Sequence, residues 1–508
     1  MMVRTLDELL RARAAAMADK PCLRTSDGSV RVSYGELDHR ASTFAAQLRA
    51  RACRPGDRVI LGLSNTPNFF VALFACFRGG LIAVPLDANL ATEELRVLVD
   101  HAEPSAIVVD DKTKAKLAQI GARCEPFTVE EGNPSISDGL PADSHDRGPV
   151  ASAEGVSEAD PALLIYTSGT TGDPKGVLFS HAQLIHKIEA IRTWFGFDES
   201  YTSLCLLPTH FGHGLICNCM STFGYGGCLV IAPPFNLDLL SRLWSILERN
   251  SVNTVSSVPT VVRLLMDHAK RRAAVLPSSL KFVTCASAPL RVDEISEFEE
   301  RFGVPLLNCY GLTETAGWSA CSPSRQDRNL ASVGKALDCE IRVVGPDGTP
   351  LKPGERGELQ IKGPSVPSGY DKAKGAFSHV TPGGWLATGD VGELDESGAV
   401  ILHTRIKEII IRAGKNIYPA EVDGVLMSHP DVAEACTVGL SDVLLGEKVA
   451  ACVVPREDSS PTEAGLIAHV QKRLAAYKCP QRIIFVDRIP KTSRGKVNRS
   501  KLRSLFGE

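Results

Sequence analysis

The sequence lacks the features that would place the chain in a membrane or on nucleic acid. Its 508 residues carry a formal net charge of −3, so the chain as a whole offers no electrostatic attraction to nucleic acid or to an anionic membrane. The most apolar stretch, FFVALFACFRGGLIAVPL from Phe69, is interrupted by Arg78 and by two glycines. This interruption favours a helix followed by a strand over a membrane span. The N-terminal segment MMVRTLDELLRARAAAMADK has no uninterrupted apolar core, so it predicts an amphipathic helix and not a signal peptide.

The cysteines lack the spacing of a metal site or of a disulfide framework. Fifteen cysteines, an odd number, are scattered from Cys22 to Cys479. The close pair Cys217 and Cys219 has neither metal-ligand spacing nor a matching second half. Free thiols in a reduced compartment are therefore the expectation, which predicts a cytoplasmic protein. The C-terminal residues LFGE do not form a peroxisomal address.

The first four hundred residues, roughly, alternate short apolar runs with segments of helical periodicity. Runs such as DRVILGLS, SAIVVD and ALLIYTS predict strands, while HAQLIHKIEAIRTWF and DLLSRLWSILERN predict helices. Strands that alternate with helices predict parallel sheets covered on both faces, the doubly wound α/β class. Ligands of such sheets bind at loops beyond the carboxyl ends of the strands. Three loops follow strands directly, TSGTTG, ASAPL and YGLTE, and they are candidates for one shared cleft.

The length of the chain and its changes of composition predict more than one domain. From about Ser332 the sequence changes to glycine-punctuated strands, which predicts a β-rich subdomain over about 332–404. After Arg405 a compact α+β segment of roughly a hundred residues follows, enough for a small domain. The stretch from Glu130 to Asp160 is rich in Gly, Pro, Ser and Asp and predicts a surface connection.

The segment YTSGTTGDPKG, Tyr166 to Gly176, has the composition of an anion-binding loop. A glycine-rich loop after a strand can turn successive N–H groups toward one phosphate, and hydroxyls and Lys175 add donors and charge. It is not the nucleotide P-loop GxxxxGK[ST], because Pro174 stands where that motif has glycine and Gly176 follows the lysine. A flexible surface loop is the alternative, but such loops rarely follow a buried strand and carry a single lysine.

This segment resembles the phosphate loop of the adenylate-forming (AMP-binding) superfamily, which includes acyl-CoA synthetases, stand-alone adenylation domains and beetle luciferases. Four further segments agree with that family in order and spacing over essentially the whole chain: NCYGLTETAG, GWLATGD, TRIKEIIIRAGKNIYPAEVD and PKTSRGKVNR. The resemblance implies a large N-terminal AMP-binding domain of layered sheets over 1–404 and a hinge at 405–408. It also implies a small mobile α+β domain over 409–508 that carries the catalytic lysine.

The resemblance implies that ATP and Mg²⁺ activate a carboxylic acid. Two anions must meet at the α-phosphorus, so the site has to supply positive charge and a metal. Glu314 is the implied Mg²⁺ ligand, with Thr167 beside it, because magnesium takes a few hard oxygens plus phosphate. Lys496 is implied to stabilise charge at the α-phosphate; its basic tail as an arm for nucleic acid is the alternative. The implied catalytic residues are Lys496, Lys175, Thr313 and Glu314.

The implied ATP site extends over both domains. Tyr310 offers a flat face for adenine, or else is plain core, and the residues of ASAP are small enough to let the ring approach. Asp390 is an acceptor-only carboxylate suited to the ribose hydroxyls, with Arg405 completing the grip; capping a turn is its alternative. The implied ATP-binding residues are Thr167, Ser168, Gly169, Thr170, Thr171, Gly172, Lys175, Ser287, Ala288, Pro289, Asn308, Tyr310, Gly311, Thr313, Asp390, Arg405 and Lys496.

A second step with CoA requires a change of conformation, because the Lys496 segment would obstruct the incoming thiol. The family rotates its C-terminal domain about one residue, which maps to Lys407. The implied CoA-binding residues are Ala413, Gly414 and Lys415; a simple turn glycine is the alternative for Gly414. The chain is compact between Gly357 and Asp390, where the family's fatty-acyl-AMP ligases carry an insertion. This compactness favours CoA as the acceptor.

The segment LPTHFGHG, Leu207 to Gly214, concerns the acid that is activated. Similar segments place an aromatic residue and then a histidine at the third position after the proline, whereas here His210 precedes Phe211. Either His210 compensates or aromatic packing forms the gate; a structural histidine is the alternative. No aspartate stands here to pair an α-ammonium, which argues against an amino-acid substrate. The implied acid lining is mostly apolar or small: His210, Phe211, His213, Val258, Leu312 and Trp318.

Together these features predict an acyl-CoA synthetase with a small carboxylic acid, ATP, Mg²⁺ and CoA as ligands, without a nucleic-acid partner or a membrane span. Loading of an acyl group onto the phosphopantetheine of a carrier protein is the first alternative. A nucleotide-binding scaffold without catalysis is the second, and an RNA-binding protein that uses the basic tail is a distant third. The length of the acid and the oligomeric state are left open.

Overall fold

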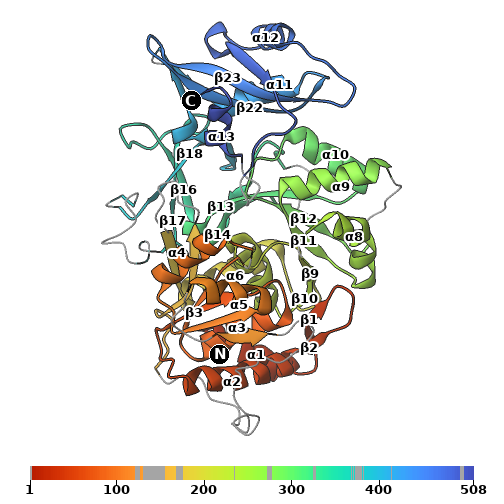
Figure 1. Ribbon diagram of the computed structural model, residues 1–508, viewed down its shortest axis with the longest axis vertical. Helices are drawn as coiled ribbons and strands as arrows, with labels where there is room; N and C mark the ends of the chain where they lie inside the picture. Colours follow the sequence, from red (N-terminus) through yellow and green to blue (C-terminus); the bar gives the residue numbers. More distant parts are fainter. Residues whose placement is uncertain are drawn as a thin grey trace. The chain divides into compact units, whose positions relative to one another are not determined.

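The computed structural model describes residues 3–87, 89–120, 126–129, 155–167, 175–233, 235–271, 277–323, 328–367, 369, 371, 380–381, 383–413, 415–491 and 497–507. Most of the predicted surface connection from 130 to 160 lies outside these residues. The chain divides into two compact units (Figure 1), Met1–Glu340 with Ile361–Leu386, and Ile341–Gln360 with Ala387–Glu508. The domain limit at 404 and the hinge at 405–408 stay predictions.

The first unit contains a six-stranded sheet in the described residues, in the order β6-β5-β3-β4-β7-β8. Its strands are parallel except for the last pair, in which β7 and β8 form an antiparallel hairpin. The sequence predicted parallel strands covered by helices, and this sheet confirms the α/β class. The strands are β3 (Arg58–Gly62), β4 (Ile82–Pro85), β5 (Ala106–Asp110), β6 (Phe127–Val129), β7 (Pro161–Thr167) and β8 (Lys175–Ser180).

A second sheet of the first unit runs β15-β14-β13-β12-β11-β9-β10-β1-β2, counted over the described residues. Its centre from β1 to β13 is parallel, and both edges are antiparallel. The strands are β1 (Pro21–Thr25), β2 (Arg31–Ser33), β9 (Thr202–Cys205), β10 (Cys228–Ile231), β11 (Thr254–Ser257), β12 (Phe282–Cys285), β13 (Leu306–Leu312), β14 (Gly317–Cys321) and β15 (Lys335–Ala336).

Helices begin and end where the local sequence supplies caps. Helix α1 starts with a capping box at Thr5, α3 carries Pro67 in its first turn, and α6 runs from a Ser180 cap to a left-handed Gly196. The helices are α1 (Leu6–Met17), α2 (Tyr34–Ala50), α3 (Pro67–Arg78), α4 (Thr92–Ala102), α5 (Asp111–Ile120), α6 (His181–Phe195), π-helix η2 (His213–Met220), α7 (Ser221–Gly224), α8 (Leu237–Arg249), α9 (Pro259–Arg271), α10 (Val292–Phe302) and the 3₁₀ turn η3 (Thr313–Thr315).

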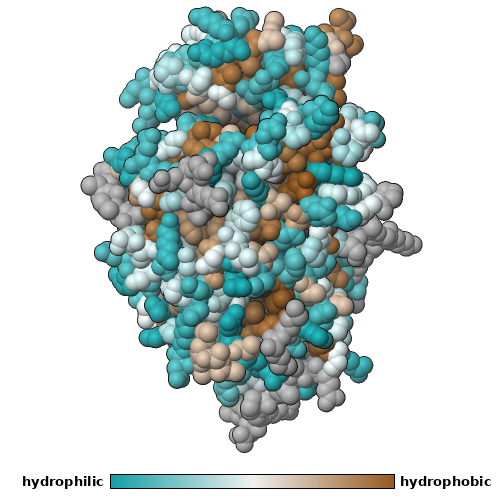
Figure 2. Space-filling view, turned by 180° about the vertical axis from the view of Figure 1, so that it is seen from behind, coloured by the Kyte–Doolittle hydropathy of each residue, from teal (hydrophilic) through white to brown (hydrophobic). Residues whose placement is uncertain are grey.

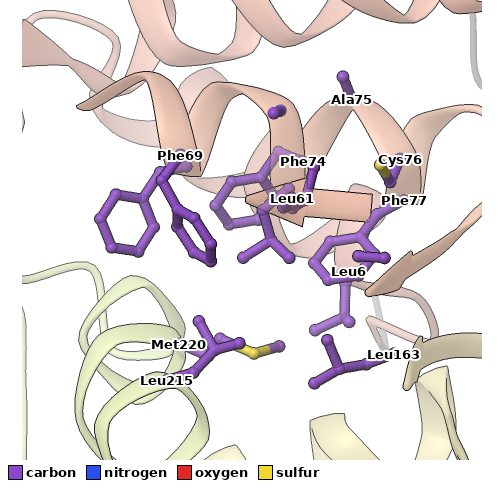
Figure 3. Close-up of a cluster of buried hydrophobic side chains, with 14 of the residues drawn as sticks. Leu6, Leu61, Phe69, Phe74, Ala75, Cys76, Phe77, Leu163, Leu215 and Met220 are labelled. Carbon is purple, nitrogen blue, oxygen red and sulfur yellow. The ribbon is translucent and has the colours of Figure 1, made fainter. Parts of the chain in front are cut away.

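Helix α3 is the centre of the largest core cluster. All its residues from Asn68 to Arg78 are buried, which confirms that the apolar stretch from Phe69 is a core helix. Figure 3 shows Phe69 and Phe74 on the side of α3 that faces Leu215 and Met220 of η2. Burial of such side chains stabilises the fold by about 1.5–3 kcal/mol each. The core therefore fixes η2, and with it the segment LPTHFGHG.

In the described residues, the second unit contains two smaller sheets. One runs β16-β17-β18-β19, and the other runs β21-β20-β23-β22 with β24 beside β23. The second sheet packs with α11 and α12 around its own apolar cluster, which agrees with a small α+β domain. The elements are β16 (Glu340–Val344), β17 (Gly357–Lys362), β18 (Leu386–Leu394), β19 (Val400–Arg405), η4 (Ile406–Glu408), β20 (Ile410–Arg412), β21 (Lys415–Ile417), α11 (Pro419–Met427), β22 (Val432–Asp442), β23 (Gly446–Pro455), α12 (Glu463–Gln471), η5 (Ala476–Lys478), β24 (Arg482–Phe485) and α13 (Arg499–Ser504).

The surface mixes polar and apolar residues. Figure 2 shows hydrophilic residues spread over the visible face, between smaller hydrophobic patches. Among the helices that the structure describes, none combines the length and the hydropathy needed to cross a bilayer.

One buried ion pair ties α6 to the segment that follows β15. Lys187 Nζ lies 2.6 Å from Asp338 Oδ1 and donates a second hydrogen bond of 2.6 Å to the carbonyl oxygen of Trp318. The side chains of Lys187 and Asp338 are each 1% exposed, and Ser365 Oγ donates to the other oxygen of Asp338 at 2.5 Å. Because this carboxylate has no access to water, it depends on its partners.

We expect Lys187→Met to lower the free energy of unfolding by about 3–5 kcal/mol, because it leaves Asp338 charged and buried without its cation. Urea denaturation is the measurement. Arg96→Ala is the matched control, since the Arg96–Glu93 pair is 48% and 75% exposed and its loss changes stability by less than about 1 kcal/mol. Equal effects of the two substitutions would contradict the assignment of a buried pair.

Candidate active site

The predicted phosphate loop connects the two strands of the β7–β8 hairpin. Thr167 and Lys175 are the last residues paired in register, so the hairpin opens at these two positions. Lys175 is half-buried there. The connecting residues 168–174 lie outside the described residues, and with them the predicted positions Ser168, Gly169, Thr170, Thr171 and Gly172.

A network of polar contacts fixes the end of this hairpin that adjoins the connecting loop. Tyr166 OH lies 2.8 Å from His101 Nδ1, and the carbonyl oxygen of Gly176 accepts a hydrogen bond of 2.8 Å from the Asp371 N–H. Asp371 also pairs with Arg58 at 2.7 Å. Burial raises the pKa of Tyr166, and the charge of Asp371 adds to the effect, so the phenol stays protonated. The strands on both sides of the glycine-rich segment are thus held rigidly.

The predicted adenine loop follows β12. Ser287 has a φ of 76°, a left-handed conformation that costs a non-glycine residue of order 1–3 kcal/mol. His213 Nδ1 lies 3.1 Å from Ser287 Oγ and holds this strained residue. Ser287 and Pro289 are exposed and Ala288 is half-buried, so the loop presents small side chains at the surface.

The segment NCYGLTETAG spans the second half of β13, the turn that contains η3, and the first residue of β14. A side chain at Gly311 would collide with the Gly317 carbonyl oxygen at 1.8 Å, so only glycine allows this close approach. Thr315 is buried and its Oγ1 accepts from Leu312 N at 3.1 Å, which closes the turn. Thr313 and Glu314 are thereby left half-buried at its tip. Upstream in β13, Asn308 and Tyr310 are 8% and 7% exposed.

The first residue of η2, His213, and the preceding Gly212 lie near several of these segments. His213 contacts both the adenine loop, through Ser287, and Trp318 of β14, with ring centroids 5.3 Å apart. Gly212 lies close to β7, because a Cβ atom added to it would be 3.9 Å from Ile165 Cδ1. Gly317 lies close to Gly212, because a Cβ atom added to Gly317 would be 3.9 Å from the Gly212 carbonyl oxygen. His213 and Gly212 thus lie near residues of β7, the loop after β12 and β14, while the shared cleft of the three loops stays a prediction.

The two histidines of the segment LPTHFGHG, His210 and His213, differ in their surroundings. Both nitrogens of His213 have hydroxyl partners, Ser287 Oγ at 3.1 Å and Ser256 Oγ at 2.8 Å, so this ring is held in place. His210 packs on Phe211 with ring centroids 4.3 Å apart, and its Nε2 lies 3.7 Å from Asp87 Oδ2. His213 therefore lacks the freedom of a moving gate. The gate role of His210 or Phe211 stays a prediction.

Of the other predicted acid-pocket residues, Trp318 contacts His213, whereas Leu312 and Val258 lie in other surroundings. Trp318 is 4% exposed, while Leu312 and Val258 are half-buried and pack against two different core clusters. Sequence reasoning missed Ser256 and Thr284, which lie beside each other on β11 and β12 with hydroxyls 3.1 Å apart. The alternation of Thr254, Val255 and Ser256 was a signal for Ser256. The strand KFVTCA contains a single hydroxyl, so there was no comparable signal for Thr284 in the sequence.

The second unit carries the remaining predicted residues. Asp390 and Arg405 are paired in register on β18 and β19, and Arg405 Nε lies 2.8 Å from Asp390 Oδ1. Asp390 is 6% exposed and its N–H donates to Thr388 Oγ1 at 3.0 Å. The predicted ribose carboxylate and its arginine are thus neighbours within this unit.

The predicted hinge and CoA residues are exposed where they are described. Lys407 lies in the 3₁₀ turn η4, and Ala413 has a φ of 48° and donates its N–H to the Leu445 carbonyl oxygen at 2.7 Å. Lys415 begins β21, with Nζ 4.5 Å from the centre of the Tyr477 ring. Gly414 and Lys496 lie outside the described residues.

The carboxylates present fit a magnesium ion held mainly by nucleotide. Among the described residues no three His, Cys, Asp or Glu side chains gather into an all-protein metal site. Magnesium bound with ATP usually takes one or two carboxylates plus phosphate oxygens and water. Glu314, at the tip of its turn, fits that requirement.

Comparison with known proteins agrees with this arrangement of sheets and loops. The model of the AMP-binding enzyme family matches residues 10–371, and that of the AMP-binding enzyme C-terminal domain matches residues 421–496. The chain therefore belongs to the AMP-binding enzyme family, which confirms the resemblance found in its sequence. With CoA ligases as its relatives, it is an AMP-forming acid–thiol ligase.

Three relatives illustrate the likeness. The sulfoacetate–CoA ligase of Cupriavidus necator is 32% identical over 98% of this chain and 97% of its own length. The feruloyl-CoA synthase of an Amycolatopsis species is 32% identical over 94% of this chain and 95% of its own. The structure of O-succinylbenzoate coenzyme A synthetase (MenE) from Bacillus subtilis, in complex with ATP and magnesium, matches with a TM-score of 0.83 and 30% identity over 97% and 99% of the two chains.

The environment of His213 predicts a dependence of stability on pH. Burial lowers the pKa of His213 from 6.5 to about 3, so the folded protein keeps this ring neutral while the unfolded chain protonates it below pH 6.5. Stability from the neutral ring is complete above pH 6.5 and is lost as pH falls toward 3. We expect the thermal midpoint to fall more steeply over this range in the wild type than in His213→Gln. Parallel slopes in scanning fluorimetry would contradict a neutral His213 in the folded protein.

Proposed function

We propose that this chain is an ATP- and Mg²⁺-dependent acyl-CoA synthetase for a small carboxylic acid. In the first step a carboxylate oxygen attacks the α-phosphorus of ATP, which gives acyl-AMP and releases pyrophosphate. In the second step the CoA thiol attacks the acyl carbonyl, which gives acyl-CoA and releases AMP. The proposal is supported by family membership, together with the contacts of His213 with Ser287 in the loop after β12 and with Trp318 of β14.

Each group of residues has a distinct role in the first step. Lys175, at the mouth of the hairpin, faces the triphosphate with positive charge, and Lys496 stabilises the charge that develops at the α-phosphate. Magnesium, when bound, neutralises phosphate charge, with Glu314 as its protein ligand and Thr167 and Thr313 nearby. The small loop from Ser287 to Pro289 receives the adenine beside Tyr310 and Asn308, and Gly311 keeps the turn close to it.

The second unit provides the remaining contacts in the proposal. Asp390 accepts hydrogen bonds from the ribose hydroxyls, and the guanidinium of Arg405 keeps that carboxylate ionised and oriented. Rotation about Lys407 then withdraws Lys496 and brings the segment from Ala413 to Lys415 to the thiol. The exposure of Ala413 and Lys415 is compatible with this role.

The final acceptor is CoA in this proposal, as the names of the relatives indicate for those proteins. A carrier-protein phosphopantetheine would use the same chemistry, and a scaffold without catalysis would bind ATP only. No described feature favours either alternative. The acids of the relatives range from sulfoacetate to ferulate, so the names do not select one substrate for this chain.

We expect Lys496→Ala to slow acid-dependent pyrophosphate release at least about 100-fold, as loss of a cation at developing charge does. ATP binding, followed by isothermal calorimetry, should change no more than a few-fold. Lys501→Ala, on the exposed face of α13, is the control and should keep its full rate. Full activity of the Lys496 variant would remove this residue from the mechanism.

We also expect pyrophosphate release to require a carboxylic acid, and CoA to turn the bound acyl-adenylate into a thioester with release of AMP. Mass spectrometry of products formed with CoA and with a holo-carrier protein separates the two acceptors. Thioester on the carrier alone would overturn CoA as acceptor. Absence of acid-dependent pyrophosphate release would revive the non-catalytic alternative.

A further inference from the structure

One face of the larger sheet is lined with hydroxyl side chains. Thr254 lies opposite Ser203 of β9, and Ser256 lies opposite Thr284 of β12. All four are at most 5% exposed. The residues that alternate with them along the strands, such as Val255, belong to the apolar cluster formed with α8, α9 and α10. A row of hydroxyls on a buried face is unusual, because each must find a hydrogen-bond partner.

A cavity lies against this hydroxyl face. Its volume is about 10 Å³, which is room for a single water-sized group. The side chains that line it carry no charge, and most of them can form hydrogen bonds. They are Phe197, Ser203, Cys217, Asn218, Tyr225, Thr254, Ser256, Thr284 and Trp318.

Part of the polar lining is already paired and part is not. Ser203 Oγ lies 2.5 Å from Tyr225 OH, and Ser256 Oγ lies within 3.1 Å of Thr284 Oγ1. The indole Nε1–H of Trp318 is buried and has no hydrogen-bond partner among the described residues. An N–H donor that is shielded from solvent in this way calls for an acceptor.

The cavity lies directly behind the residues predicted to receive the acid. His213 forms a hydrogen bond with Ser256, and its ring packs on Trp318. Both Ser256 and Trp318 line the cavity. Both ring nitrogens of His213 are occupied by hydroxyls, and its pKa is lowered to about 3, so the ring brings no positive charge. The environment at this end of the site is therefore polar but neutral.

We propose, on the basis of the proposed function, that the acid pocket ends in this hydroxyl-lined cavity and selects acids with an uncharged hydrogen-bonding group, a hydroxyl or keto oxygen, remote from the carboxylate. Trp318 Nε1–H donates to that oxygen. An acid without the oxygen leaves the polar lining unsatisfied, and a second anionic group finds no cation among the lining residues.

Matched pairs of acids test this inference through the rate of pyrophosphate release. The probes are benzoate and para-hydroxybenzoate, cinnamate and para-hydroxycinnamate, and hexanoate and its terminal hydroxy derivative, with terephthalate as the dianion. In the wild type we expect kcat/KM for the hydroxylated member of at least one pair to exceed that of its partner at least about tenfold, with the dianion poorest.

Trp318→Phe removes the indole N–H and keeps an aromatic ring, so the preference for the hydroxylated acid should fall several-fold. Trp244→Phe is the matched control, because Trp244 also has a buried Nε1 without a partner but lies in the apolar cluster on the other face of the sheet. It should leave the preference unchanged. Ser256→Ala, a smaller change in the same cavity, should lower the preference in the same direction.

The outcomes separate this inference from the function on which it rests. Pyrophosphate release with unsubstituted acids at rates equal to or above those of their hydroxylated partners would overturn the inference and leave the ligase standing. An equal loss of preference in the Trp318 and Trp244 variants would overturn it as well. Release with none of the acids, together with ATP binding, would overturn the proposed function itself.

Discussion

The hydrogen bonds of His213 hold the candidate site of the first unit together. This one ring contacts the loop after β12 through Ser287, the strand β11 through Ser256, and Trp318 on β14. Its position is itself fixed, because it begins the helix η2 that packs beneath α3 in the largest core cluster. The order of the site thus follows from burial of aromatic and aliphatic side chains that contact no ligand.

Charge is distributed unevenly over this site. Lys175 and Glu314 lie at the ends of the hairpin and the turn, where the proposed triphosphate and its metal would require charge. The region around His213 and Trp318 is neutral, although it is rich in hydroxyls. A neutral region suits an acid whose carboxylate is its only charged group, since this carboxylate then points toward the phosphates.

Much of this organisation could be predicted from the sequence. Pro67 and the Ser180 cap mark the starts of α3 and α6. The loops that contain the motifs follow the strands β7, β12 and β13, as the sequence predicted. Contacts between distant strands could not be predicted, because the sequence does not specify which residues lie side by side in a sheet. Ser287 and its partner His213 are 74 positions apart, and Lys187 and Asp338 are 151 apart. For the glycine-rich loop and Lys496, the assignment still rests on sequence pattern and family membership.

Attack by the acid on the α-phosphorus can be observed most directly by isotope transfer. If the carboxylate oxygens of a substrate acid are labelled with heavy oxygen, the oxygen that bonds to phosphorus stays there when CoA takes the acyl group. Mass spectrometry should then find one labelled oxygen in each AMP and none in pyrophosphate. Unlabelled AMP, or label in pyrophosphate or phosphate, would contradict an acyl-adenylate intermediate in this enzyme.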